Sequence, residues 1–294
     1  MILNRNSQYD KGFVIVASMH SFYKNSALTL IDSLDEYYPD CKIFVVTHKE
    51  WADEFKHLDQ VVDVVSDDMP NSVRAKLWAL RHSPFEKSCY LDADMEICDE
   101  QISDVWDLLD DDHDVAFGVI NPPNGNSTAI YNPEYEARIR DNNVEKHLRY
   151  HGGFFVWNNT EAANKAMWMW WDQYVAINCN KDWWETTGNE LDIARINIAW
   201  DQFTWWWIMK YDIPELKMQE IGDEAHETFK WNANEYLNDK FINRDDIIIK
   251  HSIINRDEMS KTEALIKRDE LDSFKREAGG RDANIDNFIA GDDK

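Results

Sequence analysis

Basic residues are scarce in this chain. Its 294 residues include 31 Lys and Arg against 56 Asp and Glu, so the formal net charge at pH 7 is −25. Proteins that hold a nucleic-acid backbone or anionic lipid by charge carry an excess of Lys and Arg. The composition therefore predicts no nucleic-acid partner and no electrostatic docking on a membrane. An anionic substrate would need a bound cation or locally placed basic side chains.

Cysteine and long apolar runs are scarce too. The four cysteines form no C-x-x-C pair and are too few for a disulfide framework. No apolar stretch approaches the roughly 20 residues needed to span a bilayer. Residues 1–11 are polar and lack the apolar core of a signal peptide. We expect no membrane span and a cytoplasmic, reducing location.

Glycine is missing where a phosphate-binding loop would need it. The first apolar run, residues 13–17, is followed by Ser18, Met19, His20 and Ser21. A dinucleotide fold or a P-loop would place a glycine-rich turn at this point. The sequence therefore argues against both of these classical phosphate sites.

Short apolar runs alternate with amphipathic segments through most of the chain. This rhythm predicts an α/β fold in which a mainly parallel sheet carries helices on both faces. We expect residues 1–278 to form one domain, with a polar excursion at 121–150 of the kind that often contributes to a binding face in α/β proteins. Residues 279–294 are rich in Gly, Asp and Asn and are predicted to form a flexible acidic tail. The expected strands are 13–17, 43–46, 61–65, 88–92, 115–120, 154–157 and 247–250. The expected helices include one that ends before Pro39 and has Ala27, Ile31, Leu34 and Tyr38 on one face, one around Trp106, and those at 72–80, 160–177 and 261–275.

The strand predicted at 88–92 ends in an Asp-x-Asp motif. Asp92 and Asp94 follow an apolar run, and the carboxyl ends of strands are where open α/β sheets bind ligands. Carboxylate oxygens suit Mg²⁺ or Mn²⁺, ions that commonly retain open positions for substrate phosphates. The motif therefore indicates a metal–diphosphate site, although a solvated acidic loop is an equal alternative on spacing alone.

The residues around this motif resemble those of the glycogenin-like glycosyltransferases. These are metal-dependent, retaining enzymes with the GT-A fold, a Rossmann-like α/β architecture. The resemblance continues in order from about residue 12 to residue 255. Its blocks are RAKLWAL at 74–80, FEKSCYLDAD at 85–94, HGGFFV at 151–156, Asp201-Gln202, and IIKH at 248–251.

The resemblance implies a role for each matched position. It implies a glycosyltransferase that moves a hexosyl group from a nucleotide sugar, a UDP-sugar by expectation, to a glycan, protein or small-molecule acceptor. The metal, Mn²⁺ or Mg²⁺, would be held by Asp92, Asp94 and His251, and the transfer site would include Asp201 and Gln202. Donor contacts are expected from Lys76, Ala93, Gly152 and Gly153. With the rule for ligands at α/β sheet edges, the resemblance also places the nucleotide base near Ala17, Ser18 and Tyr23.

The chain departs from the family pattern in two places. His151 stands where the family usually has Asn, and Ser252-Ile253-Ile254 follows the metal histidine in place of Phe-x-Gly. The diphosphate could therefore be gripped by Lys250, Arg256 or Lys261, and the sequence leaves this choice open. Two other classes also stay open: a non-catalytic carbohydrate- or nucleotide-binding module on the same fold, and a metal-dependent nucleotidyltransferase.

Tryptophan is abundant, with 14 residues that occur in clusters. Most are expected in the core. Trp183 and Trp184 lie in a predicted loop, where core packing explains them less readily. We therefore expect them to form part of the acceptor site by stacking on a sugar face. An aromatic-rich homodimer interface is the alternative.

Overall fold

The computed structural model describes residues 7–18, 20–70, 74–119, 150–179, 204–205, 208–221, 231–232 and 247–251. Several predicted features lie outside these ranges. They are residues 121–149, Trp183, Trp184, Asp201, Gln202, and everything from residue 252 onward, including the predicted helix and tail.

A seven-stranded sheet runs through the described chain in the order β3-β2-β1-β4-β7-β6-β8. Four of its neighbouring strand pairs are parallel, and β7 runs antiparallel to both β4 and β6. The fold class predicted from the sequence, a mainly parallel α/β sheet with helices on both faces, is confirmed. The strands are β1 (Tyr9–Ala17), β2 (Ile43–Thr47), β3 (Val61–Val65), β4 (Phe85–Leu91), β6 (Val115–Val119), β7 (Tyr150–Asn158) and β8 (Met218–Glu220).

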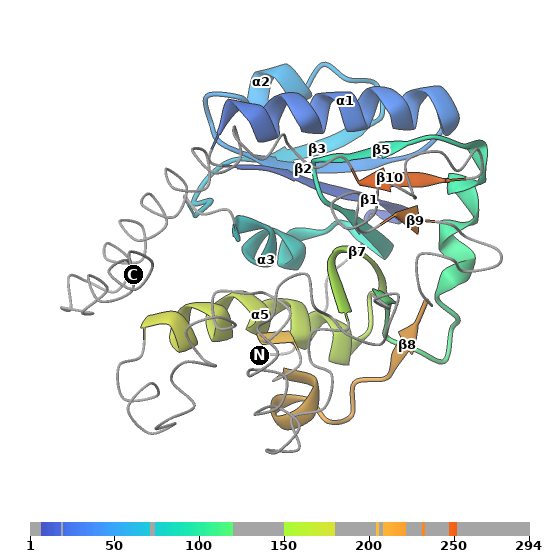
Figure 1. Cartoon of the computed structure of the whole chain (residues 1–294). Helices are drawn as coiled ribbons and strands as arrows, with labels where there is room; N and C mark the ends of the chain where they lie inside the picture. Colours follow the sequence, from blue (N-terminus) through green and yellow to red (C-terminus); the bar gives the residue numbers. More distant parts are fainter. Residues whose placement is uncertain are drawn as a thin grey trace, which may run out of the picture.

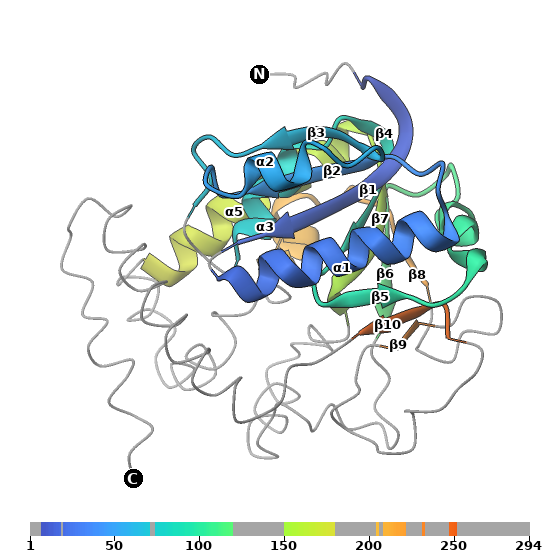
Figure 2. The same cartoon turned by 90° about the horizontal axis from the view of Figure 1, so that it is seen from above.

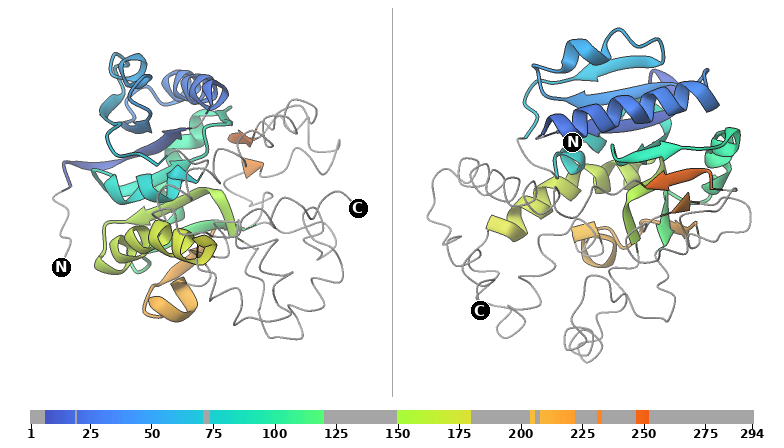
Figure 3. Two further views of the ribbon diagram at one scale, coloured as in Figure 1. Left: turned by 90° about the vertical axis from the view of Figure 1, so that its left-hand side faces the viewer. Right: turned by 45° about the horizontal axis from the view of Figure 1, so that its top comes forward.

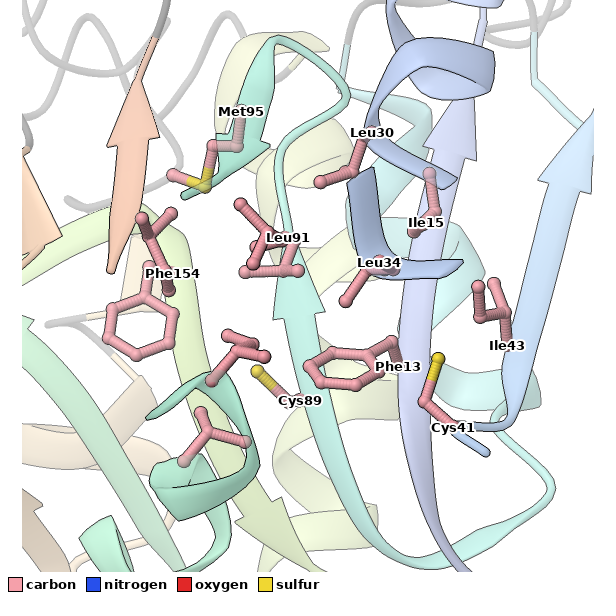
Figure 4. Packing of buried hydrophobic residues seen from close by; sticks show 14 of the residues in the cluster. Phe13, Ile15, Leu30, Leu34, Cys41, Ile43, Cys89, Leu91, Met95 and Phe154 are labelled. Carbon is pink, nitrogen blue, oxygen red and sulfur yellow. The ribbon is translucent and has the colours of Figure 1, made fainter. Parts of the chain in front are cut away.

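One face of the sheet is covered by α1 (Ser21–Tyr37) and α2 (Ala52–Phe55) (Figure 1). The α1 side chains Leu30 and Leu34 pack on apolar side chains of the strands, among them Phe13 of β1 and Leu91 of β4 (Figure 4). The residues of these strands that face the other side of the sheet are apolar and buried as well. Such fully apolar strands are typical of sheets buried on both faces. This packing explains why the apolar period of α1 predicted its buried side.

The opposite face is covered by α3 (Ala75–Ala79), the following 3₁₀ turn η1 (Leu80–His82) and α5 (Glu161–Cys179); Figure 3 shows α5 and α1 on opposite sides of the sheet. Here the core is aromatic. Phe117 stacks on Phe155 with ring centroids 4.5 Å apart, and Trp170 and Trp205 pack tilted at 4.6 Å. The expectation that most tryptophans are buried is met at these two positions.

A second, three-stranded sheet has the order β5-β10-β9 and flanks the first (Figure 2). It consists of β5 (Met95–Ile97), β10 (Ile249–His251) and β9 (Trp231–Asn232). The strand predicted at 247–250 therefore exists, but it pairs with β5 outside the main sheet. The apolar run did not predict which strand β10 pairs with, because hydrophobic periodicity indicates that a segment is a strand but not which strand lies beside it.

Two further helical segments complete the described fold. The segment predicted as a helix around Trp106 is the 3₁₀ helix η2 (Glu100–Leu108), capped by the Asp99 carboxylate, which accepts from the Gln101 N–H at 2.8 Å. The segment η4 (Ile208–Asp212) is a π-helix. None of the helices within the described residues is long and apolar enough to cross a membrane.

Candidate metal and nucleotide site

The acid pair lies where β4 leaves the main sheet. The Asp92 N–H donates to the Gly153 carbonyl at 2.9 Å, which continues the β4–β7 ladder beyond Leu91. A tight turn follows, closed by the Met95 N–H donating to the Asp92 carbonyl at 3.1 Å, and β5 begins at once. The turn therefore holds Asp92 and Asp94 between the two sheets.

The second sheet brings His251 to this turn. In the antiparallel pairing of β10 with β5, His251 lies opposite Met95, the residue after Asp94. The His251 Nε2 and the Asp94 Oδ1 are 3.1 Å apart. One ligand atom from each of Asp92, Asp94 and His251 lies within 4.8 Å of the others. Strand pairing thus joins positions 157 residues apart in the sequence.

The Asp92 carboxylate is held from one side. The Tyr90 hydroxyl donates to Oδ1 at 2.6 Å, and the Lys76 ammonium lies 3.2 Å from the same oxygen. Lys76 also donates to the Gly152 carbonyl at 2.8 Å. Its side chain is only 7% exposed, so this ammonium is committed to the turn and not to solvent.

Burial and charge act in opposite directions on Asp92. Burial alone raises the pKa of the Asp92 carboxyl. The Lys76 ammonium lowers this pKa by its charge, as does the His251 ring when it is protonated, and the Tyr90 hydrogen bond lowers it further. The partners outweigh burial, so the pKa of Asp92 lies below its usual range and the group is ionised at neutral pH.

Gly153 is required by the close approach of this carboxylate. A Cβ atom at position 153 would lie 2.4 Å from the Asp92 Oδ2 and 2.8 Å from the His151 Cε1. Any other residue would therefore push one of these two side chains aside. Glycine in a strand often marks such a close approach.

His151, the departure from the family pattern, lies beside this cluster. Its ring packs edge-to-face on the His251 ring, with centroids 5.3 Å apart and an interplanar angle of 83°. Its Nδ1 accepts a hydrogen bond from the Gly153 N–H at 3.3 Å. His151 is thus a neighbour of the three-residue cluster but not one of its members.

The residues predicted for the nucleotide base lie at the same sheet edge. Ala17 ends β1, next to β4, and its carbonyl accepts from the Thr47 hydroxyl of β2 at 3.0 Å. Ser18 is buried, and Tyr23 is half-buried in the first turn of α1. The two strands that carry Ala17 and Asp92 are direct neighbours, so the structure brings these predicted contacts to one edge.

The donor set fits a divalent cation. Two carboxylates and one imidazole converge, and carboxylate oxygens are the ligands that Mg²⁺ and Mn²⁺ prefer. Gly153 leaves the space that the Asp92 Oδ2 occupies. Sequence reasoning missed the Tyr90 hydroxyl, although one signal was available: residues two apart in a strand share a face.

No protein-family model and no curated protein matches this chain. Solved glycosyltransferase structures do resemble it. For GlyE from Streptococcus pneumoniae in its apo form, identity is 14%, the match covers 84% of this chain and 55% of GlyE, and the TM-score is 0.49. For the galactosyltransferase LgtC, solved with donor and acceptor sugar analogs, the values are 13%, 95% of this chain, 100% of LgtC and 0.47.

Other solved structures match to a similar degree. A glycosyltransferase involved in the glycosylation of the major capsid of PBCV-1 is 11% identical over 87% of this chain, with a TM-score of 0.44. A 4-diphosphocytidyl-2C-methyl-D-erythritol synthase from Anaerococcus prevotii is 10% identical over 88% of this chain, also with a TM-score of 0.44. The chain spans about half the length of GlyE. With every TM-score here below 0.5, the function proposed below rests on the chain's own residues.

Proposed function

We propose that this protein is a metal-dependent glycosyltransferase that moves a hexosyl group from a nucleotide sugar, a UDP-sugar, to an acceptor. The observation that carries the proposal is the convergence of Asp92, Asp94 and His251 at the carboxyl end of β4. In open α/β sheets this edge is where ligands bind. The motif resemblance noted in the sequence adds the reaction class and its retaining stereochemistry.

In this proposal Asp92, Asp94 and His251 hold Mn²⁺ or Mg²⁺. Such an ion would supply Lewis-acid stabilisation of the charge that develops on the departing diphosphate. Lys76 keeps Asp92 ionised, and Gly153 leaves the carboxylate room. The formal charge of −25 makes a cation more necessary here than in a basic protein, because the chain as a whole repels a diphosphate.

The remaining site roles complete the proposal. The base of the donor would lie near Ala17, Ser18 and Tyr23, at the edge shared by β1 and β4. The backbone of Ala93, Gly152 and Gly153 would border the donor sugar.

Asp201 and Gln202 would contact the reacting centre. Trp183 and Trp184 would contact the acceptor, which is a glycan, a protein or a small molecule. These four residues lie outside the described ranges, and their roles rest on the sequence alone.

The test is product analysis with Mn²⁺ and a panel of nucleotide sugars. We expect released UDP together with transferred or hydrolysed sugar. Asp94→Asn should abolish this turnover with the fold intact, because one carboxylate ligand is lost with little change in volume. Asp104→Asn, at an exposed position of η2, is the matched control and should behave as wild type.

Each contrary result favours a stated alternative. Binding of a nucleotide sugar without turnover would indicate a non-catalytic binding module. Release of inorganic diphosphate from a nucleoside triphosphate would indicate a nucleotidyltransferase. Full activity of Asp94→Asn would remove the metal mechanism.

A further inference from the structure

The two oxygens of Asp92 have different surroundings. Oδ1 accepts from the Tyr90 hydroxyl at 2.6 Å and from the Lys76 ammonium at 3.2 Å. A carboxylate oxygen offers about two lone-pair sites, so these two donors fill Oδ1. None of the described residues donates to Oδ2, which lies 2.4 Å from the position that a Cβ atom of residue 153 would take.

Of the two donors, the Tyr90 hydroxyl makes the shorter hydrogen bond to Oδ1, 2.6 Å against 3.2 Å for the Lys76 ammonium. Tyr90 and Asp92 project from the same face at the end of β4, because side chains two apart in a strand point the same way. The Tyr90 ring is only 2% exposed and lies 5.2 Å from the Phe155 ring, so its hydroxyl has a fixed position. The Lys76 ammonium lies 5.5 Å from the centre of the same ring.

We propose that Tyr90 is a positioning residue that holds Asp92 through Oδ1 and so presents Oδ2 as the atom that binds the divalent cation. The inference rests on the metal role of Asp92 in the proposed function and adds which oxygen is used and what orients it. Hydrogen bonds of this kind to a ligating carboxylate commonly change metal affinity by about 10–100-fold.

The experiment measures Mn²⁺ affinity by the loss of the free-ion electron paramagnetic resonance signal, with no substrate present. Tyr90→Phe keeps the buried ring and removes only the hydroxyl. We expect it to weaken Mn²⁺ binding by about 10-fold or more. Tyr9→Phe is the matched control, since Tyr9 packs on Phe85 at the opposite end of β4, and it should bind Mn²⁺ as wild type does.

The outcomes separate the two proposals. Wild-type affinity in Tyr90→Phe would overturn the positioning role and leave the metal site standing. Absence of Mn²⁺ binding by the unmodified chain would overturn both. Should Tyr90→Phe fail to fold, the unmodified chain is titrated with diamagnetic Mg²⁺ and the carboxyl ¹³C shift of Asp92 is followed. A Mg²⁺-dependent change with the Tyr90 hydroxyl proton still protected from exchange would support the proposal. Loss of that protection on Mg²⁺ binding would overturn it.

Discussion

Replacement of Gly153 by Ala tests how closely the turn is fitted around Asp92. The new Cβ would lie 2.4 Å from the Asp92 Oδ2, whereas close carbon–oxygen contacts are about 3.3 Å or longer. The carboxylate would therefore have to move by about 1 Å. Metal–ligand distances tolerate only about 0.2 Å, so a shift of this size takes Asp92 out of reach of the ion.

We expect Gly153→Ala to weaken Mn²⁺ binding by at least the 10–100-fold typical of disturbed ligand orientation. Overpacking should also lower the free energy of unfolding by about 1–3 kcal/mol. Mn²⁺ titration followed by paramagnetic resonance gives the affinity, and urea unfolding gives the stability.

Gly12→Ala is the matched control. Its Cβ would lie 2.2 Å from the Phe85 Cζ and 2.7 Å from the Lys42 carbonyl, so it should cost similar stability. Gly12 lies five residues before Ala17, the residue at the end of β1 that is nearest the site, and this is about 17 Å along the strand. The Mn²⁺ affinity of Gly12→Ala should therefore equal that of the wild type. Wild-type affinity in folded Gly153→Ala would refute the reasoning. Equal loss of affinity in both variants would show that the effect is general instability.

Three further outcomes are expected. When the folded protein is treated with a thiol-reactive reagent at pH 8, Cys98, which is half-buried, should be modified, whereas Cys41 and Cys89 should not. The reason is that burial raises the pKa of Cys41 to about 12 and that of Cys89 well above its usual value. Modification of Cys89 without unfolding would contradict the core packing. Because the pKa of Asp92 is depressed in the folded state, its ionised form contributes stability that is fully present above about pH 4 and is lost as the pH falls further. Lys76→Met should therefore move the titration of Asp92, followed by its carboxyl ¹³C shift, to higher pH. An unchanged titration would contradict the argument that the Lys76 charge lowers this pKa. Trp183→Ala or Trp184→Ala should weaken acceptor use more than donor hydrolysis, and a joint loss of hydrolysis and thermal stability would instead make these residues core.

Six of the seven strands of the main sheet could be predicted from the sequence because they are short and apolar; β8, which has only three residues, was not predicted. The buried side of α1 followed from the spacing of Ala27, Ile31 and Leu34. The antiparallel direction of β7 did not follow, since an apolar run looks the same in either direction. The polar 121–149 segment before it gave no direction either.

The candidate site was predicted in part. Asp92 and Asp94 were found from their place after a strand, and His251 only through the ordered resemblance. No local sequence pattern predicts that β10 pairs with β5, because strand pairing depends on residues far apart in the sequence. The resemblance predicted a donor contact for Lys76, but its contact with Asp92 was not foreseen. A lysine in a helix is ordinarily solvated, and no local pattern signals its burial against the turn.

The core on both faces of β4 also fixes the position of the site. Leu91 and Ala93 pack toward α1, while Tyr90 packs toward α3 and α5. A slip of one residue in strand register would exchange the two faces: Asp92 would enter the apolar layer under α1, and Leu91 would enter the layer under α3 and α5. Burying an unpaired carboxylate is far more costly than the small differences between alternative apolar packings. The cost of burying the carboxylate therefore favours the register in which Asp92 lies at the sheet edge, with the Tyr90 hydroxyl 2.6 Å from its Oδ1.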